Sequence, residues 1–176
     1  MNMDLLLARA AALVPEYQIP DRDYLLAESL EDLVRLNDAA EKTGGDLTKV
    51  GLRLVPEAFA PSDGEIAGIR VPELGRIAPE IRRLGGITVR GSFVCGCLDG
   101  LHGKELGRFF RACYESAKQM TVILPCTMPY LCVENGLGAL ACNLEEHPET
   151  IKDAVTAAQI VAMQNRTAFY AKLLIK

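Results

Sequence analysis

The chain has no long run of apolar residues, no low-complexity tract and no internal repeat. A helix that crosses a bilayer needs about 20 predominantly apolar residues, so the sequence predicts no membrane span. A secretory signal combines a basic leader with an uncharged apolar centre. The apolar stretch 5–14 instead follows Asp4 and contains Arg9. We interpret it as part of a short helix over 3–14 and expect a cytoplasmic protein.

Clustered positive charge is also lacking. The formal net charge is −4 and the pI is near 5.3, whereas a nucleic-acid backbone selects clustered Lys and Arg. We therefore expect no nucleic-acid partner. With 176 residues, 49% hydrophobic and 24% charged, the composition is that of an ordinary globular protein. No linker divides the chain, so we predict one α/β domain over 1–176.

Short apolar runs alternate with segments of helical periodicity. Ser29 is a predicted N-cap with Asp32 three residues later, and Gly44-Gly45 ends the helix that follows. The final segment, 168–175, is compatible with a strand or a helix. This alternation predicts βα units and a mainly parallel sheet. Two further helices are predicted over 74–84 and 104–118, and a third begins near Pro148. The predicted strands are 24–27, 50–55, 87–95, 121–125 and 130–134.

Three segments resemble one family. Residues 25–33 are similar to the S-x-E-E-L strand-to-helix entry of pyridoxal-phosphate-binding barrels, and 50–57 resemble their VGLRxNP strand. Residues 68–74 with 87–91 resemble the passage that ends in VRGL. The resemblance covers roughly residues 24–120. It is to the group of alanine racemase and the fold-type III amino-acid decarboxylases.

The resemblance implies a TIM-type (β/α) barrel with pyridoxal phosphate at the carboxyl ends of its strands. Such barrels typically have about 250 residues, so we expect a partial or shortened barrel of mainly parallel βα units. By resemblance, Arg53 and Arg90 lie near the barrel mouth. Asn135, Gly136 and Gly138 resemble the turn that receives the cofactor phosphate. A plain tight turn explains these glycines equally well.

The sequence departs from the family pattern at two places. The family's Schiff-base lysine lies on its first strand, ahead of every matched segment, and the lysines before residue 50 are Lys42 and Lys49. Neither belongs to a strand of that kind. The family's histidine after the RGL strand is replaced by the run Phe93, Val94 and Cys95.

Three functions remain open. The first is an alanine-racemase-like isomerase or a decarboxylase that acts on, or binds, an amino acid or its pyridoxal-phosphate adduct. The second is a non-catalytic protein of barrel descent that binds an anion or another small molecule, or acts as a scaffold. The third is a thiolate metal or redox protein. An incomplete barrel leaves sheet edges uncovered, so we also expect a homo-oligomer or a partner chain that completes the barrel.

Arg53 and Arg90 stand inside apolar predicted strands. A charge in a buried strand is costly unless it is paired or bound to an anion. Two hypotheses follow: each arginine contacts a phosphate or carboxylate, or it forms an ion pair with a glutamate such as Glu28 or Glu57.

The six cysteines all lie in the C-terminal half of the chain. Thiolates of Cys95, Cys97, Cys126 and Cys132 would form a metal site if they converged. Their spacing differs from the C-x2-C of common zinc modules, so we predict separate buried cysteines and no metal. Cys95 or Cys97 with His102 is a weak candidate for a nucleophile and its base. The alternative is a loop histidine near a helix start.

Overall fold

A computed structural model describes residues 25–44, 48–61, 66–96, 101, 103–124, 126, 130–133 and 172–175. Three predicted features lie outside the described residues: the helix over 3–14, the glycine turn at 135–138 and the helix that begins near Pro148.

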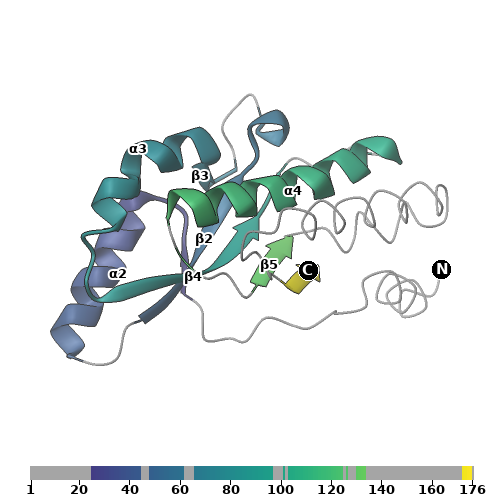
Figure 1. Ribbon diagram of the computed structural model, residues 1–176. Helices are drawn as coiled ribbons and strands as arrows, with labels where there is room; N and C mark the ends of the chain where they lie inside the picture. The colour runs from purple at the N-terminus through teal and green to yellow at the C-terminus, as the bar shows by residue number, and fades with distance from the viewer. Residues whose placement is uncertain are drawn as a thin grey trace.

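The core of the structure is a parallel sheet whose strands run in the order β1-β2-β4-β5-β6 (Figure 1), with the short strand β3 paired to β2. Every described pairing is parallel. The sheet does not close on itself within the described residues, so the predicted α/β fold with an open, barrel-like arrangement is confirmed. The strands are β1 (Leu25–Ala27), β2 (Thr48–Val55), β3 (Ile69–Arg70), β4 (Ile87–Val94), β5 (Tyr130–Val133) and β6 (Lys172–Ile175).

Three helices pack against one face of this sheet. They are α2 (Leu30–Thr43), α3 (Val71–Ile81) and α4 (Lys104–Ile123), and a short 3-10 helix, η1 (Glu57–Phe59), follows β2. Alternate residues of β2, namely Val50, Leu52 and Leu54, are fully buried in one core with the apolar faces of the helices. In the described part of the chain, no helix has both the length and the hydropathy needed to cross a membrane.

Helix α2 begins and ends as predicted. The Ser29 hydroxyl accepts a hydrogen bond from the backbone N–H of Asp32 at 3.1 Å, and the Asp32 carboxylate accepts one from the backbone N–H of Glu28 at 3.1 Å. This reciprocal arrangement satisfies N–H groups that have no partner within the helix. At the other end, Gly44 takes a left-handed conformation with φ of 61°, which a residue without a side chain adopts at low cost.

The predicted strand at 121–125 is wrong, because α4 continues through Ile123. The β-branched run Thr121, Val122 and Ile123 favours a strand locally. In the structure Met120 is fully buried on the apolar face of α4, while Val122 is 67% exposed. Burial of one helix face thus outweighs local strand propensity. The open choice at 168–175 is settled for residues 172–175, which form β6.

Asn37 connects α2 to the start of β4. Its side-chain oxygen accepts a hydrogen bond from the backbone N–H of Gly86 at 2.8 Å, and its amide donates to Glu41 at 3.0 Å. The carbonyl of Gly86 in turn accepts from the N–H of Thr48 at 3.1 Å. These bonds fix the amino ends of β2 and β4 beside each other.

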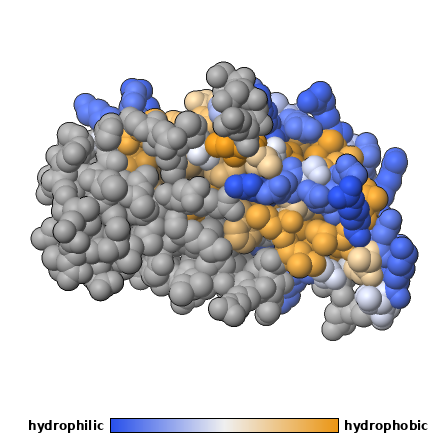
Figure 2. All heavy atoms as spheres, turned by 180° about the vertical axis from the view of Figure 1, so that it is seen from behind, coloured by the Kyte–Doolittle hydropathy of each residue, from blue (hydrophilic) through white to orange (hydrophobic). Residues whose placement is uncertain are grey.

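The far side of the molecule carries apolar side chains on the half where α2 and β1 lie (Figure 2). Of the exposed large apolar residues, Leu25 is 49% and Leu26 is 38% exposed, and both belong to β1. Within the described residues β1 pairs with β2 alone. It is therefore an edge strand with apolar side chains open to solvent.

Strand β4 has a bulge that changes which residues face the helices. Val50 pairs with Val89, but Gly51 pairs with Gly91, so Arg90 has no register partner in β2. After the bulge Ser92 pairs with Leu52 and faces the core. Its hydroxyl is buried, with no hydrogen-bond partner in the described structure.

We expect Ser92→Ala to stabilise the protein by about 1 kcal/mol, because a buried hydroxyl without a partner costs about 1–3 kcal/mol. Urea unfolding followed by circular dichroism measures the change. Ser29→Ala is the matched control, because the same substitution removes a helix cap and lowers stability by about 1 kcal/mol. A loss of stability in Ser92→Ala would show that the hydroxyl is satisfied.

Candidate functional site

The carboxyl ends of the parallel strands meet at one edge of the sheet. Glu28 directly follows β1, Arg53 lies near the end of β2 and Cys95 directly follows β4. Ligands of parallel α/β sheets and barrels bind at this edge, where loops with polar side chains leave the strands. The candidate site is therefore built from these residues and from the segments that follow β2 and β4.

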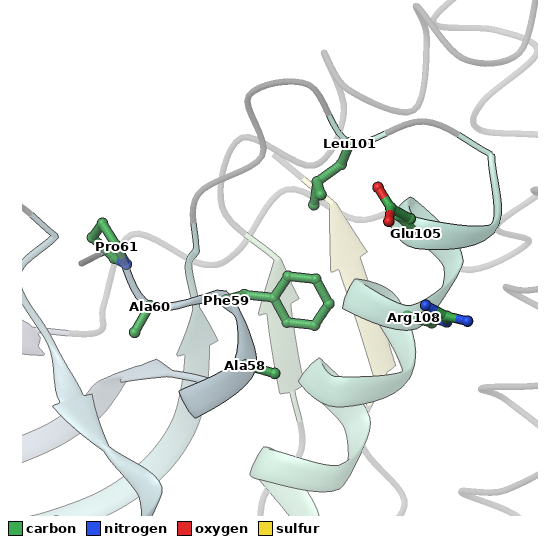
Figure 3. Close-up of a pocket in the computed structure, with 7 residues that line it drawn as sticks. All are labelled: Ala58, Phe59, Ala60, Pro61, Leu101, Glu105 and Arg108. Atoms are coloured by element: carbon green, nitrogen blue, oxygen red, sulfur yellow. The ribbon is translucent and has the colours of Figure 1, made fainter.

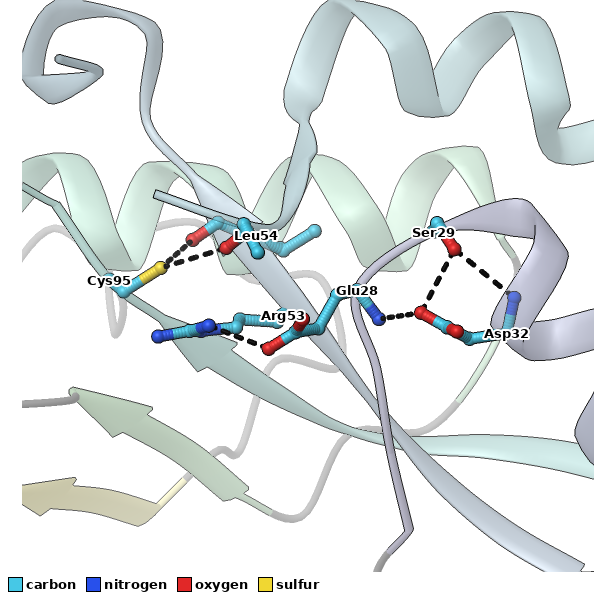
Figure 4. Close-up of polar contacts among 7 residues, drawn as sticks. Glu28, Ser29, Asp32, Arg53, Leu54 and Cys95 are labelled. Carbon is cyan, nitrogen blue, oxygen red and sulfur yellow. Dashed lines mark hydrogen bonds and ion pairs between the residues drawn. The ribbon is translucent and has the colours of Figure 1, made fainter. Parts of the chain in front are cut away.

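Glu28 and Arg53 form an ion pair across β1 and β2 (Figure 4). An Arg53 guanidinium nitrogen lies 2.6 Å from the Glu28 carboxylate, and the side chains are 23% and 39% exposed respectively. Partial burial strengthens such a pair relative to one at the surface. The ion-pair hypothesis holds for Arg53 with Glu28. Contact of Arg53 with an anionic ligand stays a prediction.

The capping residues of α2 keep Glu28 in place. Its backbone N–H is bonded to Asp32, and the Ser29 hydroxyl also donates to the Asp32 carboxylate at 2.9 Å. The start of α2 thus fixes the backbone from which the Glu28 carboxylate reaches Arg53 (Figure 4).

Arg90 differs from the prediction, because its side chain is exposed although its strand is apolar. It is the bulge residue of β4, and a bulge redirects side chains relative to the neighbouring strand. Burial raises the pKa of the Cys126 thiol, and the positive charge of Arg90 offsets part of that rise. Arg90 therefore lies near Cys126. Phe93, and not Arg90, is the register partner of Arg53.

Cys95 is buried at the carboxyl end of β4. Its sulfur lies 3.7 Å from the backbone carbonyl of Leu54 and 3.7 Å from that of Ala67. Both contacts direct the Cys95 thiol toward backbone carbonyls rather than toward another side chain. His102 lies outside the described residues, so its pairing with Cys95 or Cys97 stays a prediction.

The other candidate residues are distributed as follows. Cys113 is buried in α4, and Cys126 is partly buried. No group of three or more His, Cys, Asp or Glu side chains gathers in a metal-binding arrangement within the described residues. Candidates outside the described residues are Cys97, Asn135, Gly136, Gly138 and Cys142, and the side chain of Cys132 is also not described.

The described residues do not form a complete site for pyridoxal phosphate. An imine-forming lysine has to lie at the carboxyl edge in a sheltered position. Lys49 is exposed near the amino end of β2, and Lys42 is exposed in the last turn of α2. Lys104 begins α4, on the carboxyl side of β4, but it too is exposed. None of these three lysines combines the required position with burial.

Phe93 is the first of the three residues, Phe93 to Cys95, that stand where the family pattern has its histidine. Its ring packs over Gly51 of β2, where a Cβ atom would lie 2.3 Å from a ring carbon. Gly51 precedes Arg53 in β2, so the ring leans back from the carboxyl edge. The aromatic side chain therefore packs against the sheet and leaves the edge itself to Glu28 and Arg53.

A cavity of about 540 Å³ opens at the carboxyl edge, between η1 and the first turns of α4 (Figure 3). Its volume lies within the range of about 300–1,000 Å³ that is typical of small-molecule sites. Sequence reasoning missed this cavity, because its walls come from two segments that no motif connects. The lining residues are Ala58, Phe59, Ala60, Pro61, Leu101, Glu105 and Arg108.

We expect the double-mutant cycle of Arg53→Met and Glu28→Gln to give a coupling energy of about 1 kcal/mol or more, because the pair is partly buried. Urea unfolding of the wild type, both single variants and the double variant measures it. The cycle of Arg35→Met and Glu31→Gln is the control, since that pair is exposed on α2 and is expected to give about 0.5 kcal/mol or less. Equal coupling in the two cycles would contradict a sheltered pair at the carboxyl edge.

No family model and no curated protein matches the chain. Solved structures do resemble its fold. The arginine decarboxylase of Paramecium bursaria Chlorella virus superposes with a TM-score of 0.58 at 14% identity, over 88% of this chain and 38% of that protein. PipY of Synechococcus elongatus PCC7942, solved without pyridoxal phosphate, superposes with a TM-score of 0.56 at 16% identity, over 96% of this chain and 63% of that protein. Alanine racemase of Clostridium difficile superposes with a TM-score of 0.50 at 14% identity, over 86% of this chain and 32% of that protein.

The chain therefore spans about a third to two thirds of the length of these structures. At such low identity the likeness concerns the fold alone. It agrees with the resemblance of residues 24–120 to alanine racemase and the decarboxylases, and with the open parallel sheet. The chain has the α/β fold of these solved structures and matches only part of their length.

Proposed function

We propose that this protein binds an amino acid, or the pyridoxal-phosphate adduct of one, at the carboxyl edge of its sheet, without forming an imine through its described lysines. The observation that carries the proposal is the cavity of about 540 Å³ at that edge. In parallel α/β folds this edge is the usual place for small ligands. The solved structures with this fold include an amino-acid decarboxylase and an amino-acid racemase.

The residues at the edge favour binding over catalysis. Racemisation and decarboxylation of amino acids both need an electron sink, which pyridoxal phosphate supplies when it is bound. The guanidinium of Arg53 is already paired with Glu28. Cys95 donates to backbone carbonyls, and Phe93 replaces the expected histidine. These side chains position the strands and shape the edge, and none of them is arranged to move a proton at a ligand.

The test is a titration of the purified protein with pyridoxal phosphate, followed by absorbance and then by borohydride reduction and peptide mass mapping. We expect a saturable spectral change that an excess of amino acid alters, and no stoichiometric adduct on a single lysine. Lys104→Met is the control variant, because Lys104 is the described lysine that begins α4 at this edge, and its titration curve should match the wild type. A one-to-one adduct on one lysine would instead make the protein an imine-forming enzyme, and an unchanged spectrum would overturn cofactor binding.

We further propose that a second polypeptide chain covers the β1 edge, and that this chain is another copy of the same protein. Leu25 and Leu26 are exposed on an edge strand, and burial of apolar surface at such an edge stabilises association.

Light scattering coupled to size exclusion tests this association. We expect a mass of at least twice 19.1 kDa, and a shift to 19.1 kDa in the Leu26→Glu variant. Val122→Glu is the control, because Val122 is also an exposed apolar residue, 67% exposed against 38% for Leu26, but lies on α4. Its mass should match the wild type. A monomeric wild-type protein would contradict the proposal.

A further inference from the structure

The walls of the carboxyl-edge cavity are mainly apolar. Phe59 of η1 faces α4, with Leu101 above it and Pro61 at the far side of η1 (Figure 3). Five of the seven lining residues carry no polar side-chain atom. Such walls stabilise the apolar part of a ligand by removing it from water.

The cavity is held in shape by the packing beneath it. The ring of Phe59 meets the fully buried ring of Phe109 edge to face, with centroids 5.2 Å apart and planes at 80°. A Cβ atom on Gly96 would lie 2.7 Å from a ring carbon of Phe109 and 3.2 Å from the Cβ of Phe59. The absence of a side chain at Gly96 therefore lets the two rings pack, and Phe59 is positioned before any ligand arrives.

Two opposite charges stand on the α4 wall of the cavity. Glu105 and Arg108 are exposed residues of α4 three positions apart, a spacing at which a helix forms ion pairs. Neither forms an ion pair or a side-chain hydrogen bond with another described residue. Further along the same helix, Arg111 and Glu115 do pair, at 3.0 Å. The exposed α4 side of the cavity thus carries a carboxylate and a guanidinium that no described residue pairs, next to an apolar wall.

We infer that the cavity binds an α-amino acid with an apolar side chain of about leucine size, with its ammonium group at Glu105 and its carboxylate at Arg108. The inference rests on the proposed function and names its substrate class. A ligand with both charges satisfies both side chains, while its apolar side chain contacts Phe59 and Leu101. A lysine or glutamate side chain would place a charge against apolar walls, which is costly.

Calorimetric titration with L-leucine and two analogues, without pyridoxal phosphate, tests the inference. The analogue 4-methylpentanoate lacks the ammonium group, and 3-methylbutylamine lacks the carboxylate. We expect leucine to bind at least about tenfold more tightly than either analogue, because each analogue lacks one charge-assisted contact. The same preference is expected over L-lysine, whose side-chain charge would lie against the apolar walls. Equal affinity for leucine and lysine would overturn the inference.

Variants at the two charges distinguish their roles. Glu105→Gln should weaken leucine about tenfold and leave 4-methylpentanoate unchanged, because that analogue has no ammonium group. Arg108→Gln should weaken leucine and leave 3-methylbutylamine unchanged. Arg111→Gln is the control on the same helix and should change none of the affinities. If both charge variants bind leucine like the wild type, while their thermal melts show that they are folded, the assignment is wrong.

The two proposals fail separately. Leucine binding without any spectral change on addition of pyridoxal phosphate would support the cavity and overturn the cofactor. A saturable spectral change without leucine binding would overturn the cavity ligand and leave the cofactor proposal in place.

Discussion

The parallel pairing of β2 with its neighbours is the constraint on which the rest of this structure depends. β2 pairs with β1, β3 and β4, all in the same direction, so their carboxyl ends meet at one edge. The bonds from Asn37 to Gly86 and from Gly86 to Thr48 hold the amino ends together. Alternate residues of β2 anchor the helices in the core. Loss of this pairing would separate every group that the carboxyl edge brings together.

Glycine residues allow aromatic rings to approach the sheet at two places with different consequences. At Gly51 the ring of Phe93 packs onto β2 and leans away from the carboxyl edge. At Gly96 the missing side chain lets Phe59 and Phe109 meet beneath the cavity. The first contact fills a face of the sheet where the family pattern has a histidine. The second contact shapes the cavity at the carboxyl edge.

The charged residues at the edge fall into two groups. Glu28 and Arg53 neutralise each other in a partly buried pair that joins two strands, and this use of charge is structural. Glu105 and Arg108 stand unpaired among the described residues beside apolar walls, where a ligand with both charges would satisfy them. Under the proposed amino-acid binding, this arrangement would hold a ligand without an imine-forming lysine. This accounts for a barrel-like fold whose described residues are suited to binding.

The sequence by itself determined the α/β class, the boundaries of α2 and the course of β2 and β4, because capping, apolar periodicity and glycine stops act over a few neighbouring residues. It also limited the partners of Arg53 to an anion or a nearby glutamate. Only the tertiary structure decided that Glu28 is a partner, that 121–123 belong to a helix and that the bulge at Arg90 turns its charge outward. The cavity between η1 and α4 likewise depends on segments more than 40 residues apart. Local sequence patterns cannot predict such contacts, because the contacts form only when the parallel strands bring distant segments to the same edge.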